Sequence, residues 1–351
     1  MKKLILGLSI VSSIVSNAAG IVNIYTTRHY DADDALYKEF TKETGIKVNV
    51  VSDKSAVSIS KIKEQGRAPR ADVFMTADAG NLSRAKEAGI LQSIDSEVLE
   101  KNIPSKYQDS DNTWFGLTKR ARVFLYSKDR VSKEELESLS YESLVNNPRW
   151  EGKVLVRSSS NIYDQSLIAS FVALNGSEEA EKWVAKLGRQ MARNPEGNDR
   201  DQAVAVKDKV GDIAIANSYY YGKLIAETDK ASKYYGTADK VNLYFPDQKE
   251  GENGVHMNIS GAGVVKNAKN KEEAIKLIEF LSMKKQQEQF SATNYEFPVN
   301  PEAKMSDLLA SWLNEQGLET IKEQNINLNL LGKYNEEALN IMIKNKWDKP
   351  L

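Results

Sequence analysis

Apolar runs and amphipathic stretches alternate along the first 90 residues of this chain. Apolar runs of strand length lie at 21–26, 46–51 and 71–78. Stretches with helical spacing of apolar residues, each ending at a glycine, follow at 31–45, 58–66 and 79–89. Asp31 or Asp33 is expected to cap the first of these helices. Such an alternation predicts a parallel sheet that helices cover on both faces.

A second series of the same kind begins after residue 120. Strands are predicted at 122–127 and 153–160, a helix at 163–176, and a strand that runs into a helix at 212–227. The segment 241–248 is predicted to cross back to the first series, 256–265 to form a strand inside it, and the chain beyond Lys271 to be mostly helical.

Together the two series predict two α/β lobes joined by crossing strands. The N-terminal lobe is expected to take residues 20–121 with about 247–300, and the C-terminal lobe residues 122–246 with about 301–351. Because they link the two series, the strands at 121–127 and 241–246 are expected to act as hinges.

The first 19 residues have the three-part pattern of a signal peptide. Lys2 and Lys3 precede a short apolar run, and small residues follow it. The run Leu4–Val15 has twelve residues, which is too short for a bilayer span of about 20 residues. Cleavage is expected between Val15 and Ile21, and a buried N-terminal element is the alternative.

Composition narrows the class of protein. The chain has 351 residues, 41 % of them hydrophobic and 28 % charged, with a net charge of −1. No basic block stands out, so nucleic acid is not an expected partner. The chain has no cysteine, which excludes disulfides, thiolate metal sites and an acylated N-terminal cysteine. With one leader and no second apolar segment, the predicted location is the periplasm.

Tyrosines recur where a predicted strand turns into a helix. Of the 15 tyrosines, Tyr30 follows the first strand, Tyr163 lies in "SSSNIYDQS", and Tyr219, Tyr220 and Tyr221 form "NSYYYGKL" after an apolar strand. Open α/β sheets bind their ligands at this end of the strands. Taken singly, each ring is explained more simply as a half-buried side chain with its hydroxyl in water, and it is their shared position that indicates a site.

A phenolate oxygen is a hard, anionic ligand. Zinc more usually takes histidine or cysteine, and calcium and magnesium prefer carboxylates and carbonyls. Ionising a tyrosine of pKa ~10 at pH ~7 costs about 4 kcal/mol per ring. Three or four phenolates therefore need a strongly Lewis-acidic cation, and ferric iron is the cation they indicate.

At this point the chain resembles the periplasmic ferric-ion-binding proteins that supply ABC-type iron importers. The resemblance runs from "VNIYTTRHYDAD" through "RSSSNIYDQSLIAS" and "GDIAIANSYYYGKL" to "GVHMNISGAGVV". It implies a bilobal periplasmic-binding-protein fold of type II with the ligand in the cleft. It also implies Fe(III) as the bound ion, an inner-membrane ABC permease as partner, and a monomer.

Residue by residue, the resemblance implies a tyrosine-rich metal site. Tyr30 matches a ligand from the first lobe, and His29 matches a histidine that ligates in some members. Tyr163 matches a ligand from the second lobe. The two adjacent ligand tyrosines of the family match Tyr219 and Tyr220 best. Tyr221 is then expected to pack in the core or to lie behind the ligands.

The resemblance also bears on the anion and on the basic residues near the iron. Some members complete the iron sphere with an anion and carry fewer tyrosines, so an anion-independent site is expected here. The arginine that the family places near iron matches Arg120 or Arg122, with an exposed strand-edge arginine as the alternative. Arg28 is a further candidate, and His256 is expected to be structural.

Two other classes of protein are the alternatives to a ferric-ion-binding protein. An enzyme is disfavoured, since the chain has no dinucleotide fingerprint, P-loop, G-x-S-x-G or H-E-x-x-H motif. A solute-binding protein of the same fold for a polyamine, thiamine or an oxyanion is the other alternative, because aromatic clefts also bind organic cations.

Overall fold

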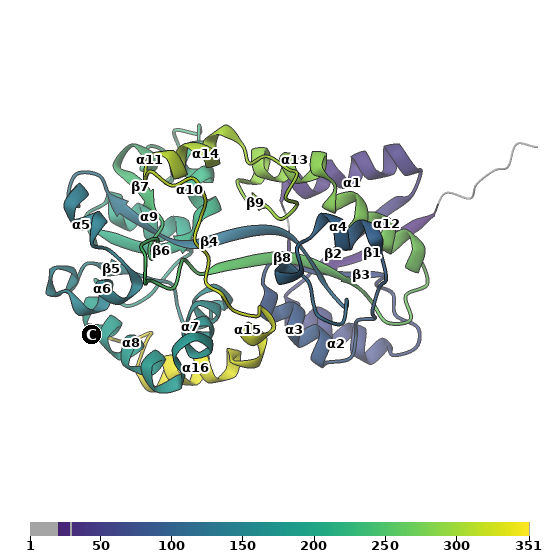
Figure 1. Cartoon of the computed structure of the whole chain (residues 1–351), viewed down its shortest axis with the longest axis horizontal. Coiled ribbons are helices and arrows are strands. Elements are labelled where there is room, and N and C mark those ends of the chain that lie inside the picture. The colour runs from purple at the N-terminus through teal and green to yellow at the C-terminus, as the bar shows by residue number, and fades with distance from the viewer. Residues whose placement is uncertain (1–19, 29, 351) are drawn as a thin grey trace, which may run out of the picture.

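The protein is described from a computed structural model that covers residues 20–28 and 30–350 (Figure 1). Its elements form two α/β lobes that are joined by long strands, which confirms the bilobal prediction. The predicted signal peptide at 1–19 and the candidate ligand His29 lie outside the described residues.

The N-terminal lobe is built on the strand order β2-β1-β3-β8-β4. These strands are β1 (Ile21–Thr26), β2 (Lys47–Ser52), β3 (Val73–Thr76), β4 (Phe115–Ser127) and β8 (Met257–Val264). The strand β1 pairs in parallel with both β2 and β3, as the β-α-β pattern predicts, whereas β8 is antiparallel to β3 and β4. The short β9 (Phe297–Pro298) pairs with β4.

In the C-terminal lobe, β4 pairs with β6 (Ile213–Asn217) on one side and with β7 (Val241–Tyr244) on the other. The strand β6 pairs in parallel with β5, which is only Val154–Leu155 and much shorter than predicted. The apolar residues of β6 are all buried, as expected for an inner strand.

The crossing between the lobes lies within β4. Its residues up to Ala121 pair with β8, and those from Arg122 pair with β6. The backbone N–H of Arg122 donates to the carbonyl of His256 at 2.9 Å, so the second crossing lies just before β8. The predicted hinge at 241–246 is therefore misplaced, because β7 is held inside the C-terminal lobe by its ladder with Phe124–Ser127.

Helices cover both lobes. The first group is α1 (Asp31–Thr44), α2 (Ser55–Gln65), α3 (Ala79–Glu87), α4 (Glu97–Asn102), α12 (Lys271–Ser282) and α13 (Lys284–Asn294). The second group is α5 (Lys133–Glu137), α6 (Tyr141–Asn146), α7 (Ile162–Asn175), α8 (Ser177–Gln190), α9 (Asp199–Lys207), α10 (Ser218–Ile225), α11 (Thr237–Lys240), α14 (Asp307–Asn314) and α16 (Asn335–Lys344). Between them, α15 (Asn329–Lys333) packs against both α3 and α7.

The start of α1 differs from the sequence prediction. Its N-cap is Tyr30, in extended backbone, and no side chain caps it. Asp31 and Asp33 instead lie in the first turn, where the helix dipole favours acidic groups. The carboxylate of Asp33 is turned to Arg28, which removes it from capping. The end of the helix at Gly45, with φ of 75°, is as predicted.

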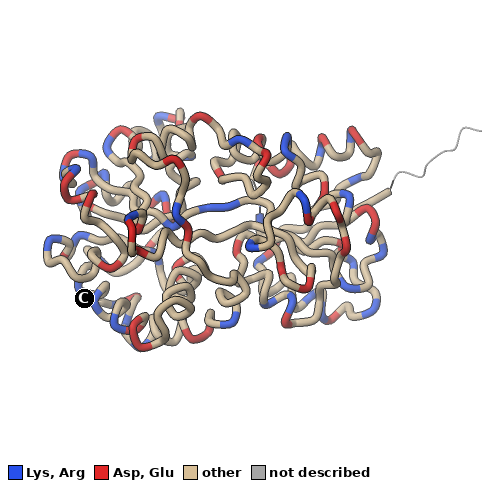
Figure 2. Tube along the Cα trace, in the orientation of Figure 1, with Lys and Arg blue, Asp and Glu red and all other residues tan. Residues whose placement is uncertain are grey.

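Acidic and basic side chains are interspersed along the trace of both lobes (Figure 2). This mixture agrees with the net charge of −1. Among residues 20–28 and 30–350, no helix has the length and apolarity needed to cross a bilayer.

Candidate metal centre

The four candidate tyrosines all stand at helix starts. Tyr30 is the N-cap of α1, and Tyr163 is the second residue of α7, where its N–H donates to the capping side chain of Asn161 at 3.0 Å. Tyr219 and Tyr220 are the second and third residues of α10. The positive ends of these helix dipoles favour negative charge, which a phenolate would supply.

Two of these tyrosines come from different lobes and meet. The hydroxyl of Tyr30 donates to the hydroxyl of Tyr219 at 3.3 Å, and the two rings are edge to face with centroids 6.1 Å apart. The rings of Tyr219 and Tyr220 lie against each other, with centroids 4.1 Å apart. Three phenol rings therefore form one continuous group.

Tyr221 is turned away from this group. Its ring is buried against Trp312 of α14, with a centroid distance of 5.5 Å. Successive residues of a helix point about 100° apart, so three consecutive tyrosines cannot share one face. The structure thus brings Tyr219 and Tyr220 to Tyr30 and sends Tyr221 into packing.

Cationic side chains lie over the rings. Arg28 lies 4.9 Å from the ring centroid of Tyr30, and Arg120 lies 5.3 Å from that of Tyr163. Arg157 also lies near Tyr163, 5.7 Å from the same centroid. The ammonium of Lys223 is 4.1 Å from the centroid of Tyr30 and 5.4 Å from that of Tyr219. Positive charge at these distances favours ionised phenols.

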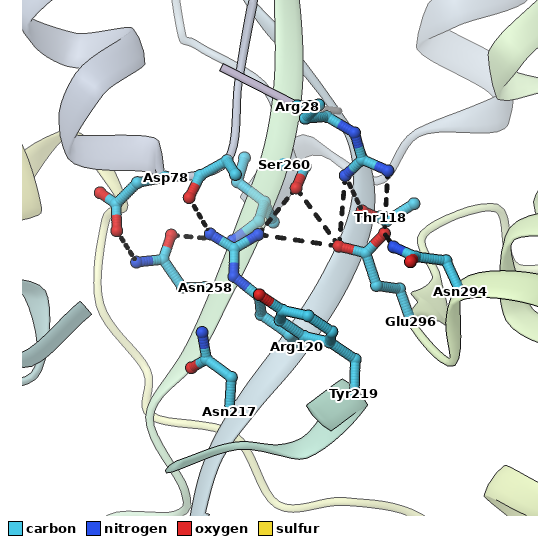
Figure 3. Close-up of polar contacts among 12 residues, drawn as sticks. Arg28, Asp78, Thr118, Arg120, Asn217, Tyr219, Asn258, Ser260, Asn294 and Glu296 are labelled. Carbon is cyan, nitrogen blue, oxygen red and sulfur yellow. Dashed lines mark hydrogen bonds and ion pairs between the residues drawn. The ribbon is translucent and has the colours of Figure 1, made fainter. Parts of the chain in front are cut away.

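A buried ion network holds Arg28 in place (Figure 3). Its guanidinium donates to Asp33 at 2.8 and 2.9 Å and to Glu296 at 3.0 and 3.2 Å. The same carboxylate of Glu296 lies 3.9 Å from Arg120, which also donates to Ser260 at 2.7 Å and to the carbonyl of Ala77. Both arginines are therefore fixed in orientation behind the tyrosines.

Arg122 is buried as well but faces another way. It forms ion pairs with Asp164 and with Asp199, the latter at 2.8 Å. Asp199 also accepts from Arg157 at 3.3 Å, so Arg122 is linked to the tyrosines through Asp199 and Arg157. The alternative of an exposed strand-edge arginine is wrong for both Arg120 and Arg122, since each is about 1 % exposed.

The surroundings keep the phenols protonated while no metal is bound. Burial is the main cause that raises the pKa of Tyr30, Tyr219 and Tyr220, and the neighbouring Tyr163 adds to it in each case. Arg28 opposes the rise in the pKa of Tyr30, and Arg120 opposes it for Tyr219. At neutral pH these three side chains are therefore neutral phenols that must lose a proton to become anionic ligands.

This donor set suits a hard, highly charged cation. Among the described residues, no group of three or more histidines, cysteines or carboxylates is arranged to hold a metal ion. A zinc, calcium or magnesium site built from their usual ligands is thus not found in that part of the chain. Clustered phenols with cations behind them fit Fe(III), which would replace their protons.

Three charged residues near the tyrosines were not predicted from the sequence: Arg157, Lys223 and Glu296. Arg157 directly precedes "SSSNIY", and Lys223 follows Tyr219 by one helical turn, so the spacing carried a usable signal for both. Glu296 is 268 residues from Arg28, and no local pattern marks it.

His256 is structural, as predicted. It is buried beside the crossing, and its Nδ1 lies 3.0 Å from Oε1 of Gln324. Burial, with smaller contributions from Arg122 and Arg120, lowers the pKa of His256 to about 4, so the ring is neutral at neutral pH.

The chain is similar to known extracellular solute-binding and iron-binding proteins of bacteria. Residues 35–315 match the family described as bacterial extracellular solute-binding protein. Iron uptake protein A1 of Synechocystis is 42 % identical over 93 % of this chain and 87 % of that protein. The major ferric iron-binding protein of Neisseria meningitidis is 28 % identical over 80 % of this chain and 81 % of its own length.

Solved structures agree with this match. The Trichodesmium protein IdiA (FutA), in complex with iron and citrate ligands, superposes with a TM-score of 0.85 at 45 % identity over 93 % of this chain and all of that one. The ferric binding protein from Campylobacter jejuni superposes with a TM-score of 0.84 at 34 % identity over 92 % of this chain and 99 % of that one. The chain therefore belongs to the bacterial extracellular solute-binding protein family.

Proposed function

We propose that this protein captures ferric iron through tyrosinate ligands and delivers it to an ABC importer. The observation that carries the proposal is that the hydroxyl of Tyr30 from one lobe lies 3.3 Å from the hydroxyl of Tyr219 from the other, with the ring of Tyr220 against that of Tyr219. Relatives named for iron uptake and ferric iron binding support the same ion.

In the proposed site, the C-terminal lobe supplies Tyr163, Tyr219 and Tyr220, and the N-terminal lobe supplies Tyr30 with help from His29. Four phenolates and one Fe(III) carry a net charge of −1. Arg28 and Arg120, fixed behind the rings, offset part of this charge and lower the cost of ionising the phenols. Arg122 affects the phenols only indirectly, through Asp199 and Arg157.

We infer a periplasmic monomer that is not an enzyme and that hands iron to an inner-membrane permease. The change of β4 partners between Ala121 and Arg122 supports the lobe boundary proposed there. An anion-independent ligand sphere is proposed because four tyrosines are available to it.

Absorption spectroscopy tests the proposal. Protein loaded with ferric iron at neutral pH should be coloured by phenolate-to-iron charge transfer. The same protein loaded with Ga(III), which has equal charge but a filled d shell, should stay colourless. A colourless iron complex would contradict tyrosinate ligation, and thermal stabilisation by a polyamine or thiamine instead of iron would favour an organic-cation site.

A further inference from the structure

A buried hydrogen bond joins the two lobes at a distance from the tyrosine hydroxyls. The Oγ of Ser166, on α7 of the C-terminal lobe, lies 2.8 Å from Oδ2 and 3.0 Å from Oδ1 of Asp78, which opens α3 of the N-terminal lobe. Both residues are completely buried. Separating the lobes would expose this carboxylate and this hydroxyl to water.

Asp78 is held rigidly on its own lobe. One carboxylate oxygen accepts from the N–H of Gly80 at 2.7 Å and so caps α3. The other accepts from Nδ2 of Asn258 on β8 at 2.8 Å, an interaction that Figure 3 shows beside Arg120. Of the side-chain bonds that Asp78 makes within the described residues, only the one from Ser166 crosses between the lobes.

Ser166 is placed one helical turn after Tyr163. Residues three apart lie on the same face of a helix, so a bond at Ser166 also restrains the turn that carries Tyr163. Arg120, whose guanidinium lies over the ring of Tyr163, donates to the carbonyl of Ala77, the residue before Asp78. The first turn of α7 is thus fixed against the start of α3.

A second connection runs beside the first. Oε1 of Gln165 accepts from Nδ2 of Asn335 at 3.0 Å, and Oδ1 of Asn335 accepts from Arg84 of α3 at 2.9 Å. Helix α7 is therefore tied to α3 directly by Ser166 and indirectly by Gln165. The indirect connection runs through a third side chain, that of Asn335 in α16, whereas the direct one needs none.

We propose that the Asp78–Ser166 hydrogen bond is a latch that holds the lobes closed around the metal site. Asp78 and Ser166 are positioning residues: they do not touch the ion, but they keep Tyr163 and the start of α7 in register with Tyr30. This inference rests on the proposed function for its effect on iron, while the latch itself is a property of the protein. A hydrogen bond to a buried carboxylate should change the ratio of closed to open forms about tenfold.

The test uses Ser166→Ala with Ser170→Ala as its control. Ser170 lies one turn further along α7 and is equally buried, and within the described part of the chain its Oγ donates only to the carbonyl of Leu167 in its own helix, at 2.6 Å. Iron release to citrate should be about tenfold faster for Ser166→Ala than for Ser170→Ala. The charge-transfer band should be the same in both, because the ligands themselves are unchanged.

Small-angle scattering of the metal-free proteins provides a second measurement that needs no iron. The latch predicts a larger radius of gyration for Ser166→Ala than for wild type or Ser170→Ala. Equal release rates together with superimposable scattering profiles would overturn the latch. If wild type binds no ferric iron, the proposed function fails, and the scattering comparison alone then decides whether the latch exists.

Discussion

The hydroxyl of Tyr30 lies 3.3 Å from the hydroxyl of Tyr219, although 189 residues separate them in the chain. The contact joins the N-cap of α1 to the first turn of α10 and so joins the two lobes. While no metal is bound, one phenol proton serves as the link between the two oxygens. A ferric ion bound by both oxygens would take the place of that proton.

The register within the three consecutive tyrosines can be tested by removing one hydroxyl at a time. Tyr220→Phe should weaken ferric affinity by at least ~100-fold, because losing a ligand should exceed the 10–100-fold typical of outer-shell changes. The ring is retained, so the fold should be unaffected. Affinity is measured by competition with citrate.

Tyr221→Phe is the matched control, since it removes a hydroxyl from a ring that packs on Trp312. Its affinity should stay within a few-fold of wild type. A large loss in the Tyr221 variant together with normal binding by the Tyr220 variant would show that the assignment of the pair is wrong.

Iron affinity should fall as pH falls. Burial raises the pKa of Tyr30, Tyr219 and Tyr220, so all three are protonated in the metal-free protein at neutral pH. Each must release its proton on binding, and each released proton makes the affinity rise tenfold per pH unit. Proton release measured during iron loading at pH ~7 should therefore be at least three per ion. Release of one proton or none would contradict ligation by these phenols.

His29→Ala should weaken ferric binding only modestly, and much less than Tyr220→Phe. A neutral imidazole supplies less charge to a hard cation than a phenolate does. Citrate competition on the two variants side by side checks this order. If the His29 variant loses as much affinity as the Tyr220 variant, the histidine is an essential ligand and the site is less tyrosine-dominated than proposed.

A side chain at Gly222, in the helix that carries Tyr219 and Tyr220, should destabilise the protein. A Cβ added there would lie 2.6 Å from Cβ and Cδ2 of Tyr295. Gly222→Ala should therefore destabilise the protein by about 1–3 kcal/mol through overpacking and displace α10, which would also weaken iron binding. Chemical unfolding measures the first effect and citrate competition the second.

Gly188→Ala, in α8, is the control for this substitution. The nearest atom to an added Cβ there is Cβ of Pro350 at 3.8 Å, which is an ordinary contact. Because alanine favours helix more than glycine does, this variant should be neutral or up to about 1 kcal/mol more stable. Equal destabilisation in both variants would show that the effect at Gly222 is not steric.

Local pattern was sufficient to predict most elements of the fold. The apolar run of β1, the glycine at the end of α1 and the junctions that carry Tyr30, Tyr163 and Tyr219 are all features of a few adjacent residues. The length of β5 was overestimated, because "KVLVRSSS" is strand-like in composition but only Val154 and Leu155 find a partner in β6.

Interactions that depend on tertiary structure were not predictable in this way. Glu296 and Arg28 come together only when β9 and α13 dock beside β4, and the bond between Asp78 and Ser166 exists only because the lobes meet. The burial of Arg120 and Arg122 has the same origin. Both occupy a strand that is covered in both lobes, whereas the sequence around them is compatible with an exposed edge.

The position of β8 in the sheet also fixes the order in which the lobes can be completed. The strand Met257–Val264 lies between β3 and β4, so the N-terminal lobe lacks an inner strand until that segment has been made. Every strand of the C-terminal lobe, ending with Val241–Tyr244, is synthesised earlier. A nascent chain that stops before Met257 can pair all strands of the C-terminal lobe but cannot complete the sheet of the N-terminal lobe. Synthesis therefore permits the C-terminal sheet to form first, so the half of the proposed site that contains Tyr163, Tyr219 and Tyr220 can be in place before the half that contains Tyr30.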